Sequence, residues 1–199
     1  MTTYLPHSRV SVVSNLYIAL LHYPVYDKHR HIVATSVTNM DVHDISRAAK
    51  TYGVERFFIV TPLDSQRAFV HRILYHWQKG YGAVFNPSRK EALDILEIRE
   101  SLDEVITDIK AQTNRGVRVV TTTASRRLQS TSYPEFSNML FNDETNHLLL
   151  FGTGWGIAEE VLARADIILE PLTGPTAYNH LSVRSAVAIV LDRLSGQKR

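Results

Sequence analysis

The chain has 199 residues, a length that suits one domain with a core of ordinary size. Hydrophobic residues make up 44% of it and charged residues 21%, a composition that excludes intrinsic disorder. Cysteine is absent, which excludes disulfides and thiolate metal sites and favours a cytoplasmic location. The net charge of +2 neither requires nor excludes a nucleic-acid partner, and no apolar run approaches the roughly 18–20 residues that span a membrane.

The first part of the chain is predicted to alternate strands with helices. A polar, flexible leader over residues 1–15 precedes a single domain over residues 16–199, which no linker or repeat divides. Asn39 or Asp41 is expected to cap the first helix. The expected strands lie over 16–22, 56–61 and 95–99, with an extended segment over 32–38. The expected helices are one that ends at Gly53, one from Pro62 to about Gln78 that Gly80 and Gly82 end, and a short one over 89–93. A further helix over 101–112 begins with the capping box of Ser101 and Glu104.

The second part continues the same alternation. The expected elements are strands over 117–123, 148–151 and 166–169, a polar basic loop over 125–132, helices over 133–139 and 157–164, a loop over 171–178, and a last helix over 179–194 with Asn179 as its N-cap. Strands that alternate with helices along a whole chain indicate an α/β fold, a mostly parallel sheet with helices on both faces.

A glycine-rich turn after the strand over 148–151 is the most informative segment. Gly152, Gly154 and Gly156 alternate with other residues directly after Phe151. Glycine lacks a Cβ and tolerates positive φ, so a ligand can lie against the main chain here. This loop, and those after the strands that end near Thr61, Thr121 and Leu169, lie where open α/β sheets bind ligands.

Alternatives remain open for this turn. A dinucleotide site is one, with Glu170 as the ribose-binding acid, but the spacing is G-x-G-x-G and the turn comes late in the chain. A purely structural tight turn is the other. Elsewhere Asn39, His43 and Arg47 share one helix face, which indicates either a solvated stripe or a face for phosphate and substrate.

Three motifs follow in order along the chain. They are Asn39-x7-Arg47-Ala48-x3-Tyr52-Gly53, then Leu149-Leu150-Phe151-Gly152-x-Gly154-x-Gly156, then Glu170-Pro171-Leu172-x-Gly174 with Asn179-x2-Ser182-x3-Ala186. Together they resemble the motifs of the SPOUT (SpoU/TrmD-like) class of RNA methyltransferases, closest in form to its SpoU branch. The phrases around Ala19–Tyr26, Phe151–Gly156 and Tyr178–Ser185 are similar to those of a small bacterial family of S-adenosylmethionine-dependent RNA methyltransferases.

The resemblance implies a fold, a cofactor and an assembly. The C-terminal strands and last helix would form a deep trefoil knot, and S-adenosylmethionine would bind in it. The enzyme would be a homodimer whose final helix completes the site, with no metal and no membrane attachment. The implied cofactor-binding residues are Thr121, Thr122, Phe151, Gly152, Thr153, Gly154, Leu169, Glu170, Leu172, Tyr178, Asn179, Leu181 and Ser182.

The resemblance also implies catalytic and substrate residues. Arg47 would orient the substrate, and Asn39 and Asp41 would complete the catalytic set, with Asp41 as a candidate base. At the second motif Gly154 stands where the SpoU branch usually has a glutamate. Arg184 on the last helix is an implied substrate contact, and the basic clusters of the sequence add Arg126, Arg127 and Arg30 as expected phosphate contacts of the RNA.

The leading functional hypothesis is therefore an RNA methyltransferase that moves a methyl group from S-adenosylmethionine to a nucleotide of tRNA or rRNA. The acceptor is either a ribose oxygen or a base nitrogen. Two alternatives from other classes are a non-catalytic RNA-binding dimer that retains the cofactor pocket and an NAD-type oxidoreductase.

Overall fold

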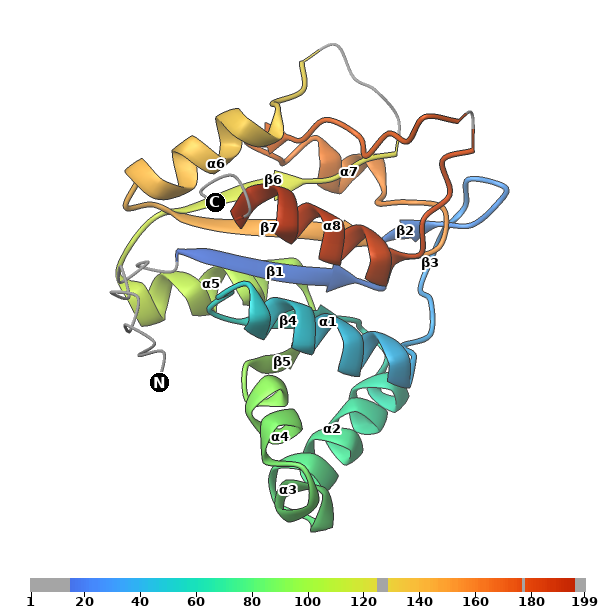
Figure 1. Cartoon of the computed structure of the whole chain (residues 1–199). Helices are drawn as coiled ribbons and strands as arrows, with labels where there is room; N and C mark the ends of the chain where they lie inside the picture. The colour runs from blue at the N-terminus through green and yellow to red at the C-terminus, as the bar shows by residue number, and fades with distance from the viewer. Residues whose placement is uncertain (1–14, 125–128, 177, 196–199) are drawn as a thin grey trace.

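Six parallel strands form the central layer of the protein (Figure 1). The structure is a computed structural model, and it describes residues 15–124, 129–176 and 178–195. The predicted leader falls almost wholly outside these ranges. In sheet order the strands are β5 (Leu96–Arg99), β4 (Phe57–Val60), β1 (Leu16–Leu21), β7 (Asn146–Gly152), β6 (Val117–Thr121) and β8 (Ile167–Ile168).

The two middle strands are apolar on both faces, which is why they occupy the centre. In β1, the residues from Tyr17 to Leu21 are buried, and in β7 those from Asn146 to Phe151. Their register pairs Ile18 with Leu149. A parallel strand covered on both faces needs such a continuous apolar run, so the predicted α/β sheet is confirmed.

Helices cover both faces of this sheet, also as predicted (Figure 1). One face packs against α1 (Asn39–Thr51), α2 (Asp64–Gln78), α4 (Pro87–Leu93), α6 (Tyr133–Asn142) and α8 (Val183–Ser195). The other face packs against α5 (Leu102–Thr113) and α7 (Glu159–Leu162). Within the described ranges, no helix has the length and apolar character to cross a bilayer.

Local capping explains where several helices start. Ser101 accepts a hydrogen bond from the Glu104 N–H at 3.2 Å, as the capping box predicts. For α1 the expected cap was wrong: Thr38, not Asn39 or Asp41, accepts from the Asp41 N–H at 3.2 Å. Threonine is as suitable here because its hydroxyl reaches the N3 amide in the same way.

The last helix starts later than its sequence pattern predicted. Asn179 is not its cap; Ser182 accepts from the Ser185 N–H at 3.2 Å, and α8 begins at Val183. The residues from Asn179 to Ser182 instead line a cavity, so tertiary structure keeps them out of the helix. Similarly, α2 begins at Asp64, two residues after Pro62.

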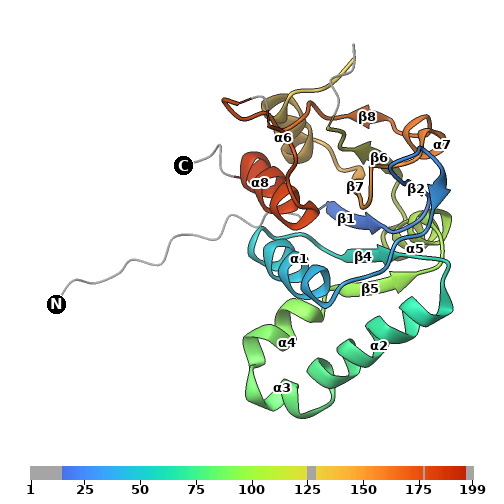
Figure 2. The same cartoon turned by 90° about the vertical axis from the view of Figure 1, so that its right-hand side faces the viewer.

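A short helix between the second and third predicted helices was missed. Gly80 is the N-cap of α3 (Tyr81–Phe85), and Gly82 lies inside it instead of ending the previous helix. A Cβ on Gly82 would lie 2.7 Å from the Trp77 ring, so glycine allows this close packing. Together α2, α3 and α4 project from the edge of the sheet (Figure 2).

Several predicted elements are shorter than expected, among them the strand over 166–169, which is only β8. The extended segment over 32–38 contributes only β3 (Ile32–Val33), which pairs antiparallel with β2 (Val25–Tyr26). The strand over 117–123 ends at Thr121, and the helix over 157–164 is reduced to the single turn of α7. Residues 34–38 and 122–123 lie instead in loops at the carboxyl edge of the sheet.

Candidate functional site

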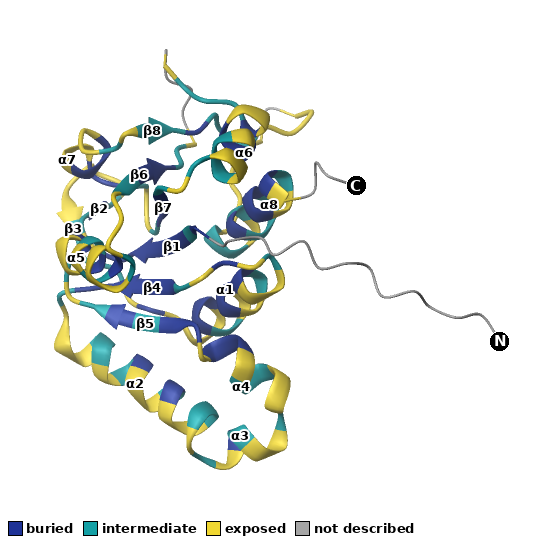
Figure 3. Ribbon diagram, turned by 90° about the vertical axis from the view of Figure 1, so that its left-hand side faces the viewer, coloured by how far each residue is buried: buried dark blue, intermediate teal, exposed yellow. Residues whose placement is uncertain are grey.

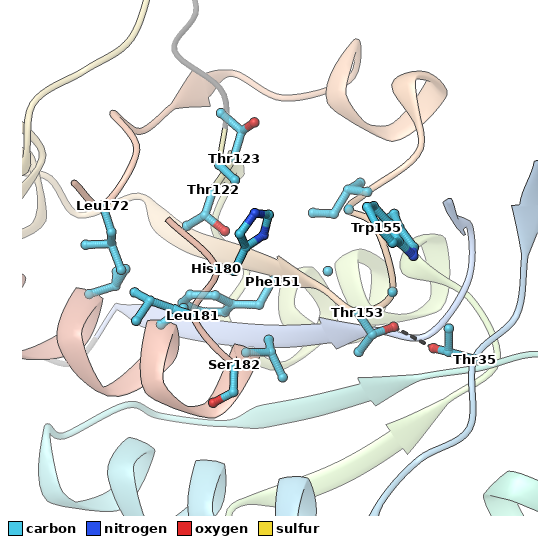
Figure 4. A pocket seen from close by; sticks show the side chains of 18 of the residues that line it. Thr35, Thr122, Thr123, Phe151, Thr153, Trp155, Leu172, His180, Leu181 and Ser182 are labelled. Atoms are coloured by element: carbon cyan, nitrogen blue, oxygen red, sulfur yellow. Dashed lines mark hydrogen bonds between the residues drawn. The ribbon is translucent and has the colours of Figure 1, made fainter. Parts of the chain in front are cut away.

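A cavity of about 760 Å³ lies at the carboxyl ends of β6, β7 and β8 (Figure 4). Its volume falls within the roughly 300–1,000 Å³ of small-molecule sites. Its residues are Arg30, Thr35, Ser36, Thr38, Asp41, Thr122, Thr123, Ala124, Tyr133, Phe151–Ile157, Glu159, Leu162, Glu170, Leu172, Asn179–Val183, Ala186 and Val190. Loops after several parallel strands therefore converge on one space, as the sheet topology predicts.

Apolar side chains and main chain form much of the cavity wall. Phe151 ends the buried run of β7, while Leu172 and Leu181 come from the loop that precedes α8 (Figure 4). Val183 and Val190 of α8 add to the same wall. Apolar walls beside exposed main chain suit a ligand with a flat, polar-edged ring and an aliphatic part.

The glycine turn is held against the chain itself. A Cβ on Gly152 would lie 2.5 Å from Ile157 Cγ1 and 2.9 Å from the Ile157 nitrogen. A Cβ on Gly154, where φ is +57°, would lie 2.7 Å from the Tyr26 carbonyl oxygen. Glycine is therefore required at both positions. The sequence suggested that the glycines make room for a ligand, whereas in the structure they make room for Ile157 and for the Tyr26 carbonyl.

The β2–β3 hairpin fixes this turn in place. The Tyr26 N–H donates to the Gly156 carbonyl at 2.9 Å, and the Trp155 N–H donates to the Tyr26 carbonyl at 2.8 Å. The Arg30 guanidinium lies over the Tyr26 ring at 3.8 Å from its centroid, which places Arg30 at the cavity. The hairpin thus supplies one wall and stiffens the turn.

A hydroxyl pair with a buried histidine behind it lies beside the turn. The Thr35 and Thr153 hydroxyl oxygens are 2.5 Å apart (Figure 4), and Thr153 also donates to the Leu21 carbonyl. His22 Nδ1 lies 3.0 Å from the Thr35 hydroxyl. Burial lowers the pKa of His22 to about 4, so the ring is neutral at physiological pH.

Asp41 is the buried carboxylate of the cavity. The Thr38 hydroxyl donates to its Oδ2 at 2.6 Å, and the Arg184 Nη1 lies 3.4 Å from its Oδ1. Arg184 also reaches the exposed carboxylate of Asp44, 3.6 Å away. These partners hold Asp41 in one orientation while the side chain still faces the cavity.

The loop that follows β8 is anchored to α6. The Glu170 N–H donates to the Thr131 carbonyl at 2.9 Å, and the Tyr133 hydroxyl donates to the Glu170 carbonyl at 3.1 Å. Burial raises the pKa of Tyr133 to about 12, so this phenol remains a donor at physiological pH. The wall formed by residues 170–172 is therefore fixed from outside the cavity.

Most of the predicted site residues meet in this cavity. The structure brings together Arg30, Asp41, Thr122, Phe151, Gly152, Thr153, Gly154, Glu170, Leu172, Asn179, Leu181 and Ser182. Thr121 and Leu169 are buried and do not line it; the Leu169 N–H donates to the Thr121 carbonyl at 2.9 Å. These two residues support the wall instead of forming it.

The remaining predicted residues lie elsewhere. Asn39 and Arg47 are exposed on α1 and do not line the cavity, and Tyr178 is 74% exposed beside its mouth. Arg126 and Arg127 lie outside the described residues. Arg184 is positioned behind Asp41 and contacts it directly.

Several lining residues were missed at the sequence level. They are Thr35, Ser36, Thr38, Tyr133 and Trp155, among others. The signal for three of them is the run Thr35-Ser36-Val37-Thr38, in which hydroxyl residues stand between an extended segment and a helix. Such a run is typical of a loop that faces a ligand. Nothing in the sequence indicates Tyr133, because its contact with Glu170 spans 37 residues.

A metal site finds no support in the described part of the chain. Across residues 15–124, 129–176 and 178–195, no group of three His, Asp or Glu side chains has a metal-binding arrangement. The buried His147 on β7 also lacks a hydrogen-bond partner for both ring nitrogens, and burial lowers its pKa, so it acts as a core residue.

Comparison with known proteins identifies the family. Residues 15–196 match the family described as SAM-dependent RNA methyltransferase. An Aquifex aeolicus protein described as uncharacterized is 40% identical over 190 residues, which are 96% of this chain and 93% of that protein. A tRNA (guanine-N(1)-)-methyltransferase of Oleidesulfovibrio alaskensis is 43% identical over 92% of this chain, which spans only 42% of that longer protein.

A solved structure with the same fold was determined with its cofactor. The SpoU methyltransferase AviRb of Streptomyces viridochromogenes, in complex with AdoMet, gives a TM-score of 0.54 at 15% identity. The alignment covers 92% of this chain and 57% of AviRb. At this identity the likeness shows the fold alone.

The family description names S-adenosylmethionine as the cofactor, so the NAD-type oxidoreductase hypothesis is wrong. The parallel sheet, the glycine turn and the cavity at its carboxyl edge agree with the match over residues 15–196. The chain belongs to the family of S-adenosylmethionine-dependent RNA methyltransferases.

Proposed function

We propose that this protein methylates a nucleotide of tRNA in the cytoplasm, and that Asp41 accepts the proton that the methylated atom loses. The single observation that supports it is a buried carboxylate on the wall of a cavity that loops of three parallel strands build. S-adenosylmethionine supplies a methyl group already activated by a positively charged sulfur. The chain must then align the acceptor atom with that methyl group and exclude water.

The cavity wall fits the proposed cofactor. Its apolar side chains, Phe151, Leu172 and Leu181, suit the faces of an adenine ring, and the main chain of residues 152–154 suits its polar edges. Thr35 and Thr153 add hydroxyl groups to the cavity wall. Of the implied cofactor-binding residues, we therefore assign this role to those that line the cavity, and a supporting role to Thr121 and Leu169.

Asp41 is the proposed proton acceptor. An alcohol or a protonated ring nitrogen must lose a proton on methylation, and a carboxylate within hydrogen-bond reach accelerates this by about 10²–10⁴-fold. Thr38 and Arg184 hold the carboxylate in place, so its orientation is set before substrate binds. Arg184 then contacts the substrate only indirectly, as a positioning residue for Asp41.

A homodimer would bring Arg47 into a site. Met40, Tyr178 and Leu181 are 58%, 74% and 50% exposed, and each lies next to or among residues that line the cavity. Exposed large apolar side chains favour a protein contact. Arg47 lies on the exposed side of α1, two turns beyond Asp41. We propose that α1 and α8 pair with those of a second copy, so that Arg47 and Asn39 act at the partner's cavity mouth.

We also propose that the C-terminal part is knotted. The segment after β8 pairs with Thr131, and α8 then packs against α1 and α6.

The preference for tRNA comes from the relatives. The Oleidesulfovibrio protein and a Nitratidesulfovibrio vulgaris protein, 44% identical over 92% of this chain, both carry tRNA methyltransferase names. This chain spans 42% of each, so the named activity belongs to a protein more than twice as long. We therefore propose tRNA as the substrate class of this chain, and we propose no particular nucleotide or atom as the methylated position.

Calorimetry and a labelled-methyl assay test the proposal. Titration with S-adenosylmethionine should give one site per chain, and labelled methyl should reach tRNA from a strain that lacks the gene. If the label appeared in rRNA alone, the substrate would be rRNA and not tRNA. Cofactor binding without any label in RNA would identify a binding protein that does not catalyse.

A further inference from the structure

The segment over residues 65–90 has an unusual composition. It contains Arg67, Arg72, Lys79, Arg89 and Lys90, two histidines, and no Asp or Glu. Five of the 22 Lys and Arg residues lie here, so the other 17 are outnumbered by the 20 Asp and Glu residues. Outside this segment the chain therefore has a net charge of −3, and the segment alone carries +5.

This segment forms most of a projection, which we define as α2, α3 and α4 (residues 64–93). In Figure 2 it extends away from the sheet, with α3 at its far end. Figure 3 shows most of α3 and one side of α2 in the colour of exposed residues. The cavity lies on another part of the molecule, so the projection is a second surface with its own chemistry.

Aromatic side chains are exposed at the far end of the projection. Tyr75, Tyr81 and Phe85 are 69%, 73% and 70% exposed. The Tyr81 and Phe85 rings are stacked on each other, with centroids 5.8 Å apart and an angle of 27° between planes. Large rings are normally buried, so an exposed cluster indicates a binding surface.

Cations with no carboxylate partner lie beside these rings. Arg72 and Lys79 are exposed, and among the described residues neither forms an ion pair. Together with His71, Tyr75 and Gln78 they line a shallow hollow on α2. Arg89 lies over the half-buried Trp77 ring, which packs against the core, at 4.9 Å from its centroid.

The projection starts at the rim of the cavity. Gln66, in the first turn of α2, accepts a hydrogen bond from the Val37 N–H at 2.7 Å. Val37 lies between Ser36 and Thr38, which both line the cavity. The 15 residues of α2 then extend about 22 Å to α3, at roughly 1.5 Å per residue.

We propose that the projection is an RNA-docking surface, on which unpaired bases stack against Tyr81, Phe85 and Tyr75 while Arg72 and Lys79 bind phosphates. Aromatic faces beside cations are the means by which proteins hold single-stranded RNA. The proposal rests on the proposed function, because it assigns the RNA substrate a second contact away from the cavity. With Asp64 and Glu91 counted, the projection carries a net charge of +3 and the rest of the chain −1, so the projection is the part of the domain suited to a polyanion.

Charge complementarity favours RNA over a protein partner here. The cores of protein–protein interfaces are depleted of lysine and of charge in general. In contrast, this surface places Arg72 and Lys79 beside Tyr75 in one hollow, with no acidic residue between positions 65 and 90. A second copy of the chain would bring the same positive charge against it.

Fluorescence anisotropy of the full chain tests the proposal with two RNA probes, a 5′-fluorescein-labelled 12-residue oligouridine and labelled bulk tRNA. The double variant Tyr81→Ala/Phe85→Ala should bind both about 10- to 100-fold more weakly, since each stacked base contributes about 1–3 kcal/mol. The double variant Arg72→Gln/Lys79→Gln should lower the slope of log affinity against log salt concentration by about 1.4.

The matched control is Lys110→Gln/Arg115→Gln, two exposed cations on the other face of the sheet. It should keep the affinity and the salt slope. Unchanged oligouridine and tRNA affinity in both projection variants would overturn the proposal. A loss of affinity that accompanies dissociation of a dimer in sedimentation velocity would also overturn it, because the surface would then be a contact between copies.

Titration with S-adenosylmethionine separates this proposal from the proposed function. All projection variants should bind the cofactor with unchanged affinity and show the thermal melting of the unmodified chain. A chain that binds oligouridine through the projection but transfers no methyl group keeps the docking surface and rejects the enzyme. A chain that methylates tRNA equally well with and without Tyr81 and Phe85 rejects the docking surface and keeps the enzyme.

Discussion

The cavity and the projection use glycine and aromatic residues in opposite ways. At the cavity, Gly152 and Gly154 bring main chain against main chain, and Phe151 and Tyr133 are buried while Trp155, also part of the lining, is exposed. At the projection, Gly82 makes room for the Trp77 ring, while Tyr81 and Phe85 stay exposed.

The difference separates recognition of the small cofactor from binding of the RNA polymer. A buried, main-chain wall recognises one small molecule by shape, whereas an exposed cationic and aromatic surface binds a polymer without sequence preference. The two regions meet where Gln66 contacts Val37 and where His43 of α1 packs against Trp77 of α2. Variants in one region should therefore leave the function of the other nearly unchanged.

The strongest test of this separation is Asp41→Asn. We expect methyl transfer to fall by about 10²–10⁴-fold, because the amide cannot accept a proton. Cofactor affinity from calorimetry and RNA affinity from anisotropy should stay within about twofold. The matched control is Asp44→Asn, which also removes a partner of Arg184 but is exposed, and it should retain most activity. Equal loss in both variants would remove Asp41 from the catalytic role.

Gly152→Val tests whether the close main-chain approach shapes the cavity. Its Cβ would meet Ile157 at 2.5 Å, so the turn must open and cofactor binding should be lost. We expect the unfolding free energy to fall by about 2–3 kcal/mol as well, a typical cost of overpacking. Gly174→Ala is the control, because a Cβ there meets nothing within 4 Å. Retained cofactor affinity in Gly152→Val would mean that the turn does not form the pocket.

The buried His22 makes the cavity side sensitive to acid. Its pKa is about 4 in the folded chain, against about 6.5 when unfolded, so the unfolded state binds the extra proton between these values. The contribution of neutral His22 to the unfolding free energy is therefore complete above pH 6.5. The unfolding free energy should fall by about 3 kcal/mol as the pH drops to 4.

Urea denaturation at a series of pH values measures this loss. His22→Asn keeps a polar group near the Thr35 hydroxyl and removes the titration, so its stability should change less across the same range. Burial also lowers the pKa of His43 and His147, which adds a shallower loss in the same direction for both proteins. Identical profiles for the two proteins would contradict the assignment to His22.

Gly82→Ala makes the corresponding change in the projection. The new Cβ would meet the Trp77 ring at 2.7 Å and the His76 ring at 3.0 Å, and these side chains can move aside. We expect a cost of about 1–2 kcal/mol in the unfolding free energy, with unchanged cofactor affinity. Gly116→Ala is the control, since its nearest neighbour is Thr145 at 3.9 Å. Loss of cofactor binding in Gly82→Ala would show that the two regions are coupled.

The smallest effect is expected for Tyr133→Phe. It removes the hydrogen bond from the phenol to the Glu170 carbonyl and leaves the ring in place. The expected loss is about 1 kcal/mol in the unfolding free energy. Thermal melting measures it, and Tyr23→Phe at an exposed position serves as the control.

The sequence by itself determined the sheet and the glycine turn, and its motifs, read as a family resemblance, supplied most of the predicted residues that meet in the cavity. Apolar runs such as Leu148–Phe151 have only one stable location, between two layers of helices, and glycines directly after such a run mark a turn. These are properties of neighbouring residues, so they can be predicted from the order of side chains alone.

Only the tertiary structure decided which side chains share the site and where the last helix begins. Thr35 reaches Thr153 across 118 positions, and Arg184 reaches Asp41 across 143. Ser182 replaces Asn179 as the helix cap because the loop before it must stay open along the cavity wall. The free energy of such contacts depends on how distant strands and loops pack together, and no local pattern in the chain encodes that.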